Sequence, residues 1–300
     1  MDWGSKGIDG FTSVTFKDVH TAIDPSSLKV PHKPFVVCVL GASRDIGRGI
    51  ATAYAKAGAT SLVLSARSTT SLDDTAATCK FISPGIKIET VECDIANAAS
   101  VATLAARTKE SFGRVDVVAI NSGFSGDCLP NLLDVPPESY QQAVDVNYVG
   151  TFHVARQFIP LLLESPDGAK TLTCVSSIAS LIVRGPIANA QYCVSKLAQL
   201  KLMEHVHEEF CGQGLKAFCV HPGAINSEMA RETAPREFLQ YLTDSPELCG
   251  AFCLWLSAAP DARAWLSGRL LSAKWDPAEL EERKDEIVEK ELLTTRLKLY

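Results

Sequence analysis

The sequence has little positive charge to offer a polyanionic partner. Its 29 lysines and arginines are outnumbered by 35 aspartates and glutamates, which leaves a net charge of −6 over 300 residues. Nucleic-acid binders usually present a basic face, so this balance argues against a nucleic-acid partner. The chain also lacks the Lys/Arg-rich amphipathic helix that is typical of proteins lying on a membrane surface. We therefore expect small molecules or further copies of the chain as partners.

Long apolar runs and cysteine pairs are missing as well. No segment reaches the roughly 18 uninterrupted apolar residues of a membrane span. The first ten residues contain no apolar core of a signal peptide, so we expect a cytoplasmic protein without membrane association. The ten cysteines form no CxxC pair and no Cys/His group with zinc spacing, which predicts no metal site. Many lie in apolar runs, which favours buried thiols over disulfides.

What the sequence does contain is a regular alternation of strand and helix patterns. Apolar residues make up 46% of the chain, enough for a sizeable core. Short β-branched runs predict strands at 35–40, 61–66, 86–92, 115–120, 171–176 and 215–220, with a short seventh near 268–272. Helical patterns fall at 47–57, 72–81, 98–112, 137–163 and 190–211. This order predicts an α/β Rossmann-type fold, with a doubly wound parallel sheet of about seven strands.

The composition does not change within 35–272, which we therefore interpret as one domain. Residues 1–34 are polar and rich in turn formers, and they predict an N-terminal arm. Residues 273–300 contain a charge-dense stretch with good helix propensity, which predicts a helical tail with a solvated face.

A glycine-bearing turn, Gly41 to Gly47, joins the first predicted strand to the first helix. Glycines let the backbone approach a pyrophosphate, and the N-terminus of the helix supplies free N–H groups and a positive dipole end. The second strand ends in Ser65-Ala66-Arg67-Ser68, without the carboxylate that would accept the ribose hydroxyls of NAD. Arg67 and Arg44 offer planar groups for a 2′-phosphate instead, which favours NADP(H), although each could be an ordinary surface cation. Asp94, after the third strand, is placed to face an adenine.

The segment 176–196 carries the most specific pattern. Tyr192 and Lys196 are four residues apart, so on a helix they lie on one face. An ammonium beside a phenol favours the phenolate, and we expect it to lower the pKa of Tyr192 toward a range useful for proton transfer. Ser177 ends the fifth predicted strand, at the edge of the sheet where ligands collect.

Together these motifs resemble the short-chain dehydrogenase/reductase family over about residues 35–272. The TGxxxGxG loop of the family matches Leu40 through Gly47, and its NNAG motif matches Ile120 through Gly123. Its active-site asparagine matches Asn147, its serine Ser177, its YxxxK pair Tyr192 and Lys196, and its PG turn Pro222-Gly223. The flanking arm and tail are similar to fungal members, many of them from secondary metabolism.

The resemblance implies a role for each matched position. Tyr192 would be the general acid/base, and Lys196 would lower its pKa and bind the nicotinamide ribose. Ser177 would position the substrate carbonyl, and Asn147 would hold a water that continues a proton relay. Members commonly form dimers or tetramers, so we expect a homodimer or homotetramer. The expected contacts to NADP(H) are Gly41, Ser43, Arg44, Ile46, Gly47, Arg67, Asp94, Ile95, Asn121, Gly123, Tyr192, Lys196, Pro222, Gly223 and Ile225.

Two features depart from the family pattern or vary within it. Asp45 replaces the middle glycine of the phosphate loop; we expect it to tolerate unusual backbone angles and to cap the following helix, the alternative being that its charge weakens cofactor binding. Residues 224–246 follow the PG turn, where the family has a substrate lid that varies with the substrate. The leading hypothesis is an NADP(H)-dependent ketone reductase or secondary-alcohol dehydrogenase. The alternatives are a cyclase or isomerase without net redox chemistry, and a non-catalytic NADP(H)-binding protein.

Overall fold

A computed structural model describes residues 10–129 and 131–297, and within them the chain forms one seven-stranded parallel sheet. The strand order is β3-β2-β1-β4-β5-β6-β7, so the Rossmann-type fold predicted from the sequence is confirmed. The strands follow the predicted runs closely, and the short seventh strand is present. Their bounds are β1 Val36–Leu40, β2 Ser61–Ala66, β3 Lys87–Glu92, β4 Val117–Ile120, β5 Thr171–Val175, β6 Lys216–His221 and β7 Leu270–Ser272.

Strands β1 and β4, at the centre of the sheet, are apolar throughout because both faces of the sheet are covered. Alternate residues of β1 show this directly. Val37 and Val39 belong to one core cluster, whereas Cys38 and Leu40 belong to the cluster on the opposite face, and all four are completely or almost completely buried. Eight of the ten cysteines are buried, as their apolar surroundings predict, and all ten are free thiols.

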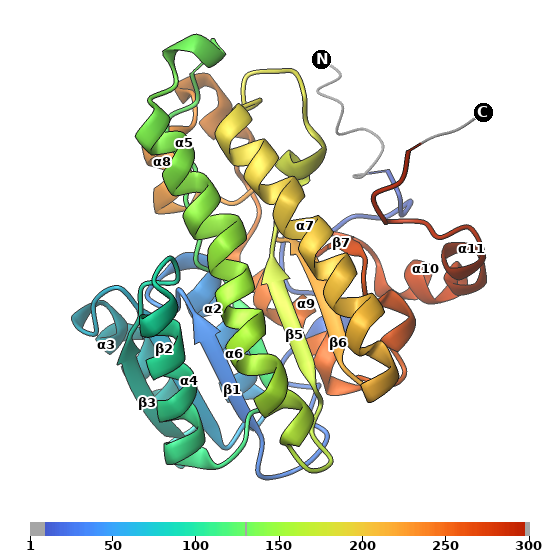
Figure 1. Cartoon of the computed structure of the whole chain (residues 1–300). Helices are drawn as coiled ribbons and strands as arrows, with labels where there is room; N and C mark the ends of the chain where they lie inside the picture. The colour runs from blue at the N-terminus through green and yellow to red at the C-terminus, as the bar shows by residue number, and fades with distance from the viewer. Residues whose placement is uncertain (1–9, 130, 298–300) are drawn as a thin grey trace.

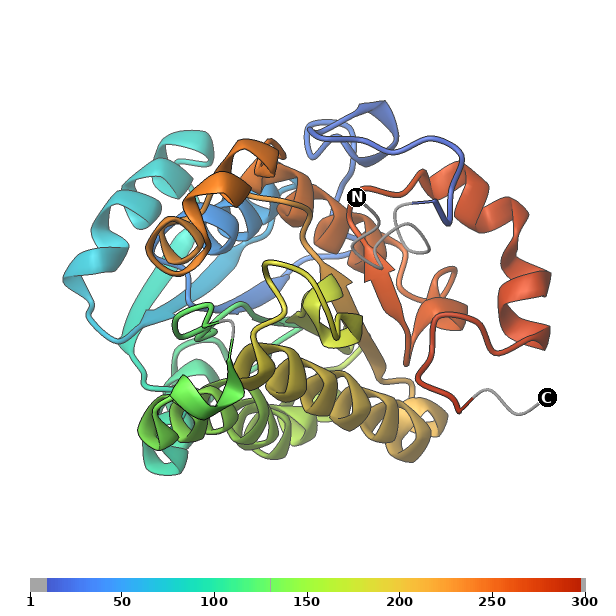
Figure 2. The ribbon, with the colours of Figure 1, turned by 90° about the horizontal axis from the view of Figure 1, so that it is seen from above.

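Helices cover both faces of the sheet (Figures 1 and 2). On one face lie α2 (Asp45–Lys56), α3 (Asp73–Ile82) and α9 (Pro246–Ala258), and α2 packs closely on α9. On the other face lie α4 (Ala98–Phe112), α6 (Gly150–Glu164) and α7 (Ala190–Phe210). The shorter helices are α5 (Pro137–Ala143), α8 (Glu228–Thr233), α10 (Pro277–Glu282) and α11 (Lys284–Glu289).

The sequence pattern at 137–163 predicts one helix, and the structure corrects this to three successive segments. Helix α5 passes into a π-helical segment, η4 (Val144–Val149), which continues into α6. A π segment inserts wider i→i+5 turns without changing the apolar periodicity enough to be read from the sequence. Its effect is local: it carries Asn147 into the interior, where the side chain is completely buried.

The described parts of the predicted arm and tail lie against each other, as the blue and red ribbons of Figure 2 show. Thr15 pairs with Trp275 in an isolated antiparallel bridge. The Glu279 carboxylate accepts hydrogen bonds from the backbone N–H groups of Ser13 and Val14, at 2.7 and 2.9 Å. Residues 1–9 of the arm and 298–300 of the tail lie outside the described residues. Within the described ranges no helix has the length and apolarity to cross a bilayer.

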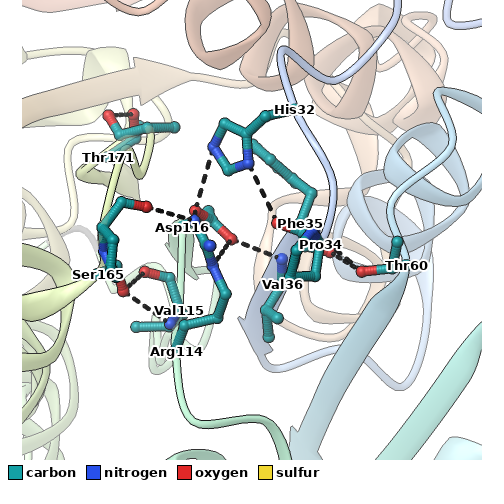
Figure 3. Close-up of polar contacts among 12 residues, drawn as sticks. His32, Pro34, Phe35, Val36, Thr60, Arg114, Val115, Asp116, Ser165 and Thr171 are labelled. Carbon is teal, nitrogen blue, oxygen red and sulfur yellow. Dashed lines mark hydrogen bonds and ion pairs between the residues drawn. The ribbon is translucent and has the colours of Figure 1, made fainter.

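The amino ends of the central strands are held together by one buried carboxylate (Figure 3). Asp116, just before β4, accepts the N–H of Val36 at the start of β1, at 2.8 Å, and pairs with the guanidinium of Arg114 at 2.6 Å. His32 of the arm lies 3.4 Å from the same carboxylate. These contacts join the arm, β1 and β4 at the amino ends of the strands, opposite the candidate active site.

Candidate active site

A cleft of about 1060 Å³ lies at the carboxyl ends of the strands, where a parallel α/β sheet binds its ligands. All but two of the residues predicted from the sequence line this cleft. The exceptions are Gly47 and Asn147, both of which are buried behind its wall. The lining includes Gly41, Ser43, Arg44, Ile46, Arg67, Asp94, Ile95, Asn121, Gly123, Ser177, Tyr192, Lys196, Pro222, Gly223 and Ile225.

The turn after β1 needs glycine at two positions. Gly41 has a φ of +77°, in the left-handed region that side chains disfavour. A Cβ atom on Gly47 would lie 1.9 Å from the Gly41 carbonyl oxygen, so only glycine fits there. The Asn121 side chain fixes the turn by donating to the same carbonyl at 2.8 Å. The first turn of the twelve-residue helix α2 has no side-chain cap, which leaves its N–H groups for an anion in the cleft.

Asp45 shows why an aspartate can replace the family's glycine, and it corrects one prediction. Its φ of +44° is the left-handed conformation that the glycine would supply, and aspartate tolerates it better than most residues. The predicted capping role is wrong, however, because α2 starts at Asp45 itself and its N-cap is Arg44. The Asp45 carboxylate instead accepts the backbone N–H of Glu228 at 3.0 Å. Asp45 therefore ties the phosphate loop to the first residue of α8.

Arg44 takes part in the same contact. Its Nε lies 3.0 Å from a carboxylate oxygen of Glu228, and both side chains are about half exposed. Arg67, at the end of β2, is exposed and lines the same end of the cleft, and so does Asp94 after β3. The structure thus brings the two predicted phosphate-binding arginines to one cleft, with Glu228 competing for one of them.

Tyr192 and Ser177 meet at the floor of the cleft. Ser177 follows β5, and Tyr192 lies in the first turn of α7, with its hydroxyl in hydrogen-bonding contact with the Ser177 side chain. Asn189 caps this helix, and its side-chain oxygen accepts the Tyr192 N–H at 3.4 Å. The Asn189 amide also donates to the carbonyls of Ser125 and Asp127, at 3.0 and 3.1 Å. The start of α7 is therefore anchored to the loop after β4.

The prediction that the pKa of Tyr192 is lowered is wrong. Burial raises the pKa of Tyr192 to about 12, and the hydrogen bond with Ser177 only partly opposes that effect. The Lys196 ammonium lies 5.7 Å from the centre of the Tyr192 ring. Tyr192 is consequently a protonated phenol at neutral pH, which suits the donation of a proton.

Lys196 is 3% exposed, and its ammonium is held from two sides. Nζ donates to the carbonyl oxygen of Val175 at 2.9 Å and to Oε1 of Gln199 at 3.0 Å. Desolvation lowers the pKa of Lys196, while the nearby Cys174 and Cys219 thiols oppose that shift. An ammonium has three donors, so one remains to be offered to a ligand in the cleft.

Asn147 is connected to Lys196 through the side chain of Gln199. Its side chain exchanges hydrogen bonds with the backbone of Phe124 and donates to Ser195 at 2.9 Å. Its backbone carbonyl accepts from Gln199 Nε2 at 2.9 Å and from the Thr151 hydroxyl at 2.8 Å. These two donors engage both lone pairs of the oxygen.

The contacts of a buried histidine and of the predicted lid complete the description of the cleft. Burial and the Lys274 ammonium lower the pKa of His221 to about 3, so His221 is neutral and accepts the Ile178 N–H at Nδ1. Asp244, at the end of the predicted lid, accepts the Ala224 N–H at 2.7 Å and lies 3.6 Å from Lys274. The segment 224–246 is thereby fixed at both ends.

Sequence reasoning missed Gln199 and Glu228. Gln199 stands one helical turn after Lys196, so its spacing was a signal: a polar residue on the same face of a helix as a buried lysine. Glu228 left no such signal, because its partners Arg44 and Asp45 are more than 180 residues away in the chain.

Comparison with known proteins agrees with this geometry. The family model for short chain dehydrogenases matches residues 35–237. A short chain dehydrogenase of Monascus purpureus is 39% identical over 295 residues, covering 97% of this chain and 98% of the relative. Another, from Aspergillus terreus, is 31% identical and covers 98% and 95%. A solved short chain dehydrogenase from Shigella flexneri, complexed with NADP, is 27% identical with a TM-score of 0.73, over 83% of this chain and 99% of that one.

The chain therefore belongs to the short chain dehydrogenase family, a family of oxidoreductases that use nicotinamide cofactors. These relatives from Monascus and Aspergillus are fungal, which agrees with the similarity of the flanking segments to fungal members.

Proposed function

We propose that the protein is an NADP(H)-dependent ketone reductase or secondary-alcohol dehydrogenase that acts on a small-molecule metabolite, with Tyr192 as its general acid/base. The observation that carries this proposal is the contact of the Tyr192 and Ser177 hydroxyls on the floor of the cleft, beside the Lys196 ammonium. A carbonyl oxygen entering the cleft there meets two hydroxyl donors and a nearby cation.

The residues present fit a nicotinamide dinucleotide. The uncapped first turn of α2 and the glycine turn would hold the pyrophosphate, and the remaining donor of Lys196 would hold a ribose hydroxyl. When bound, the cofactor supplies or accepts the hydride. Tyr192 donates its phenolic proton to the substrate oxygen in reduction, and Ser177 holds that oxygen by a hydrogen bond. In oxidation the proton returns to Tyr192.

The substrate end of the cleft is largely apolar. The lid contributes Met229, Phe238, Tyr241 and Leu242, and the segment after β5 contributes Ile178, Ile182 and Ile187. Such a lining favours a substrate whose body is neutral and apolar around the reacting carbonyl. Fluorescence titration with NADPH and NADH, followed by loss of nicotinamide absorbance over a panel of aryl and alkyl ketones, tests the function. Failure to bind either dinucleotide would overturn it, and tight binding without turnover would favour the two alternatives, a non-redox enzyme or a non-catalytic NADP(H)-binding protein.

Arg67 is expected to set the preference for the phosphorylated cofactor. Arg67→Ala should weaken NADPH binding by about tenfold, because a guanidinium–phosphate contact is lost, and should leave NADH binding nearly unchanged. The measurement is the dissociation constant of each dinucleotide by fluorescence titration. Arg107→Ala, at an exposed arginine of α4 paired with Glu89, is the matched control. Equal losses for both dinucleotides would contradict the 2′-phosphate role.

Glu228 is expected to oppose that preference. Glu228→Gln removes the charge that pairs with Arg44 but retains the backbone N–H that Asp45 accepts. Exposed ion pairs contribute little, so NADPH binding should tighten only about two- to fivefold, with no gain for NADH. Glu232→Gln, on the same helix and exposed, serves as control. A gain shared by both dinucleotides would show that Arg44 does not contact the 2′-phosphate.

A further inference from the structure

Gln199 is a completely buried amide placed between Lys196 and Asn147. Its Oε1 accepts from the Lys196 ammonium at 3.0 Å. Its Nε2 donates to the Asn147 carbonyl at 2.9 Å and to the Thr151 hydroxyl at 2.8 Å. The amide therefore uses both of its N–H donors and one of the two lone pairs of its oxygen. These contacts fix its orientation.

The contacts of Gln199 join two separate parts of the fold. Lys196 and Gln199 lie on α7, whereas Asn147 and Thr151 lie on η4 and α6. A side chain that only filled the space between these helices would need no acceptor pointing at an ammonium. Here the amide turns its oxygen toward the cation and both N–H groups toward the neighbouring helix.

A buried ammonium needs such acceptors. Removing it from water is costly, and hydrogen bonds to its charged form offset part of that cost. The Val175 carbonyl is fixed by the sheet, so it holds Nζ from one direction only. Gln199 supplies the second direction and limits the positions that Nζ can adopt. The titratable groups that face the ammonium are Tyr192 on its own helix, Cys174 on β5 and Cys219 on β6.

We propose that Gln199 is a positioning residue for the reaction: it fixes Lys196 Nζ toward the cofactor side of the cleft and ties it to the helix that carries Asn147. The first half of this inference is a property of the protein alone. The statement about the cofactor rests on the proposed function, so the two are tested separately.

The first experiment is a double-mutant cycle in urea unfolding, which requires neither cofactor nor substrate. Gln199→Met keeps the approximate volume but removes the acceptor, and it is compared in the wild-type chain and in the K196M background. We expect Q199M to lower the unfolding midpoint clearly in the wild type and by less than half as much in K196M, where no buried ammonium remains. An equal loss in both backgrounds would overturn the proposal, because it would make Gln199 merely a packing residue.

The second experiment measures NADPH binding by fluorescence as a function of pH. Loss of a hydrogen bond to a charged group should weaken NADPH about tenfold in Q199M. Because the lost bond favoured the charged form, the alkaline decline in binding should also move to lower pH. Thr108→Val removes a buried hydroxyl of α4 that donates to the Leu104 carbonyl and has no part in the Lys196 contacts, so it should change neither quantity. An unshifted pH profile in Q199M, or an equal shift in T108V, would overturn the positioning role. If the wild type fails to bind NADPH, the proposed function fails while the cycle still decides whether Gln199 holds Lys196.

Discussion

Tyr192→Phe is expected to reduce the rate of ketone reduction by about a thousandfold, the range that one positioned acid contributes. The substitution removes a single oxygen and retains the ring, so the fold of α7 and the cleft wall should persist. NADPH affinity should stay within about twofold of the wild type, because most of the proposed dinucleotide contacts, those of the glycine turn, Arg67 and Lys196, do not involve the Tyr192 hydroxyl. Loss of nicotinamide absorbance under saturating NADPH measures the rate, and fluorescence titration measures the affinity.

Tyr241→Phe is the matched control, since Tyr241 lines the same cleft from the lid side and is 57% exposed. It should change the rate by no more than a few-fold. Retained reduction in Tyr192→Phe would show that another group donates the proton. A parallel collapse of NADPH binding would instead show that the hydroxyl serves cofactor binding.

The pH dependence follows from the sign of the Tyr192 shift. Burial raises the pKa of Tyr192 to about 12, so the phenol keeps its proton throughout the neutral and mildly alkaline range. Reduction, which needs the protonated form, should therefore show no decline from this group between about pH 7 and about pH 9. Alcohol oxidation needs the phenolate, and its rate should rise with pH across the same interval. Initial rates in both directions across this interval check the assignment.

Much of the fold could be predicted from the sequence because its signals are local. A strand such as β1 is a continuous apolar run, and the turns between elements carry glycine or polar residues. The π-helical segment around Asn147 could not be predicted this way. Within it, the Asn147 side chain bonds to Phe124 and Ser195, which are distant in the chain. Periodicity alone does not register such a local change in winding.

The residues of the candidate site likewise fall into those that the local sequence could place and those that it could not. Tyr192, Lys196 and Ser177 could be placed because spacing and position on the sheet edge suffice to bring them together. The behaviour of Asp45 could not, since its partner is the backbone of Glu228, which the fold and not the local sequence brings near. The direction of the Tyr192 pKa was also predicted wrongly. Spacing indicates that a cation is near, whereas the degree of burial, which raises the pKa of Tyr192 here, is a property of the folded chain.

Asp116→Ala is expected to cost about 3–5 kcal/mol of unfolding free energy, the usual range when one partner of a buried ion pair is removed. Asp116 is completely buried, and Arg114 keeps only 13% of its side-chain exposure. The substitution would leave that guanidinium without its carboxylate, although Arg114 would still reach the Pro166 carbonyl. It would also strip the Val36 N–H of its acceptor at the start of β1 (Figure 3).

Urea unfolding at neutral pH measures this loss, and the position of Asp116 makes the result specific. The carboxylate lies at the amino edge of the sheet, opposite the cleft, so NADPH affinity of the folded variant should remain at the wild-type value. Glu164→Ala, which breaks the exposed Lys109–Glu164 pair, should change the free energy of unfolding by less than about 1 kcal/mol. A similar small loss for Asp116→Ala would mean that water or a neighbouring donor takes over the contacts of the carboxylate. A large loss with unchanged NADPH binding would show that this cluster stabilises the sheet without shaping the active site, as its placement at the far ends of β1 and β4 requires.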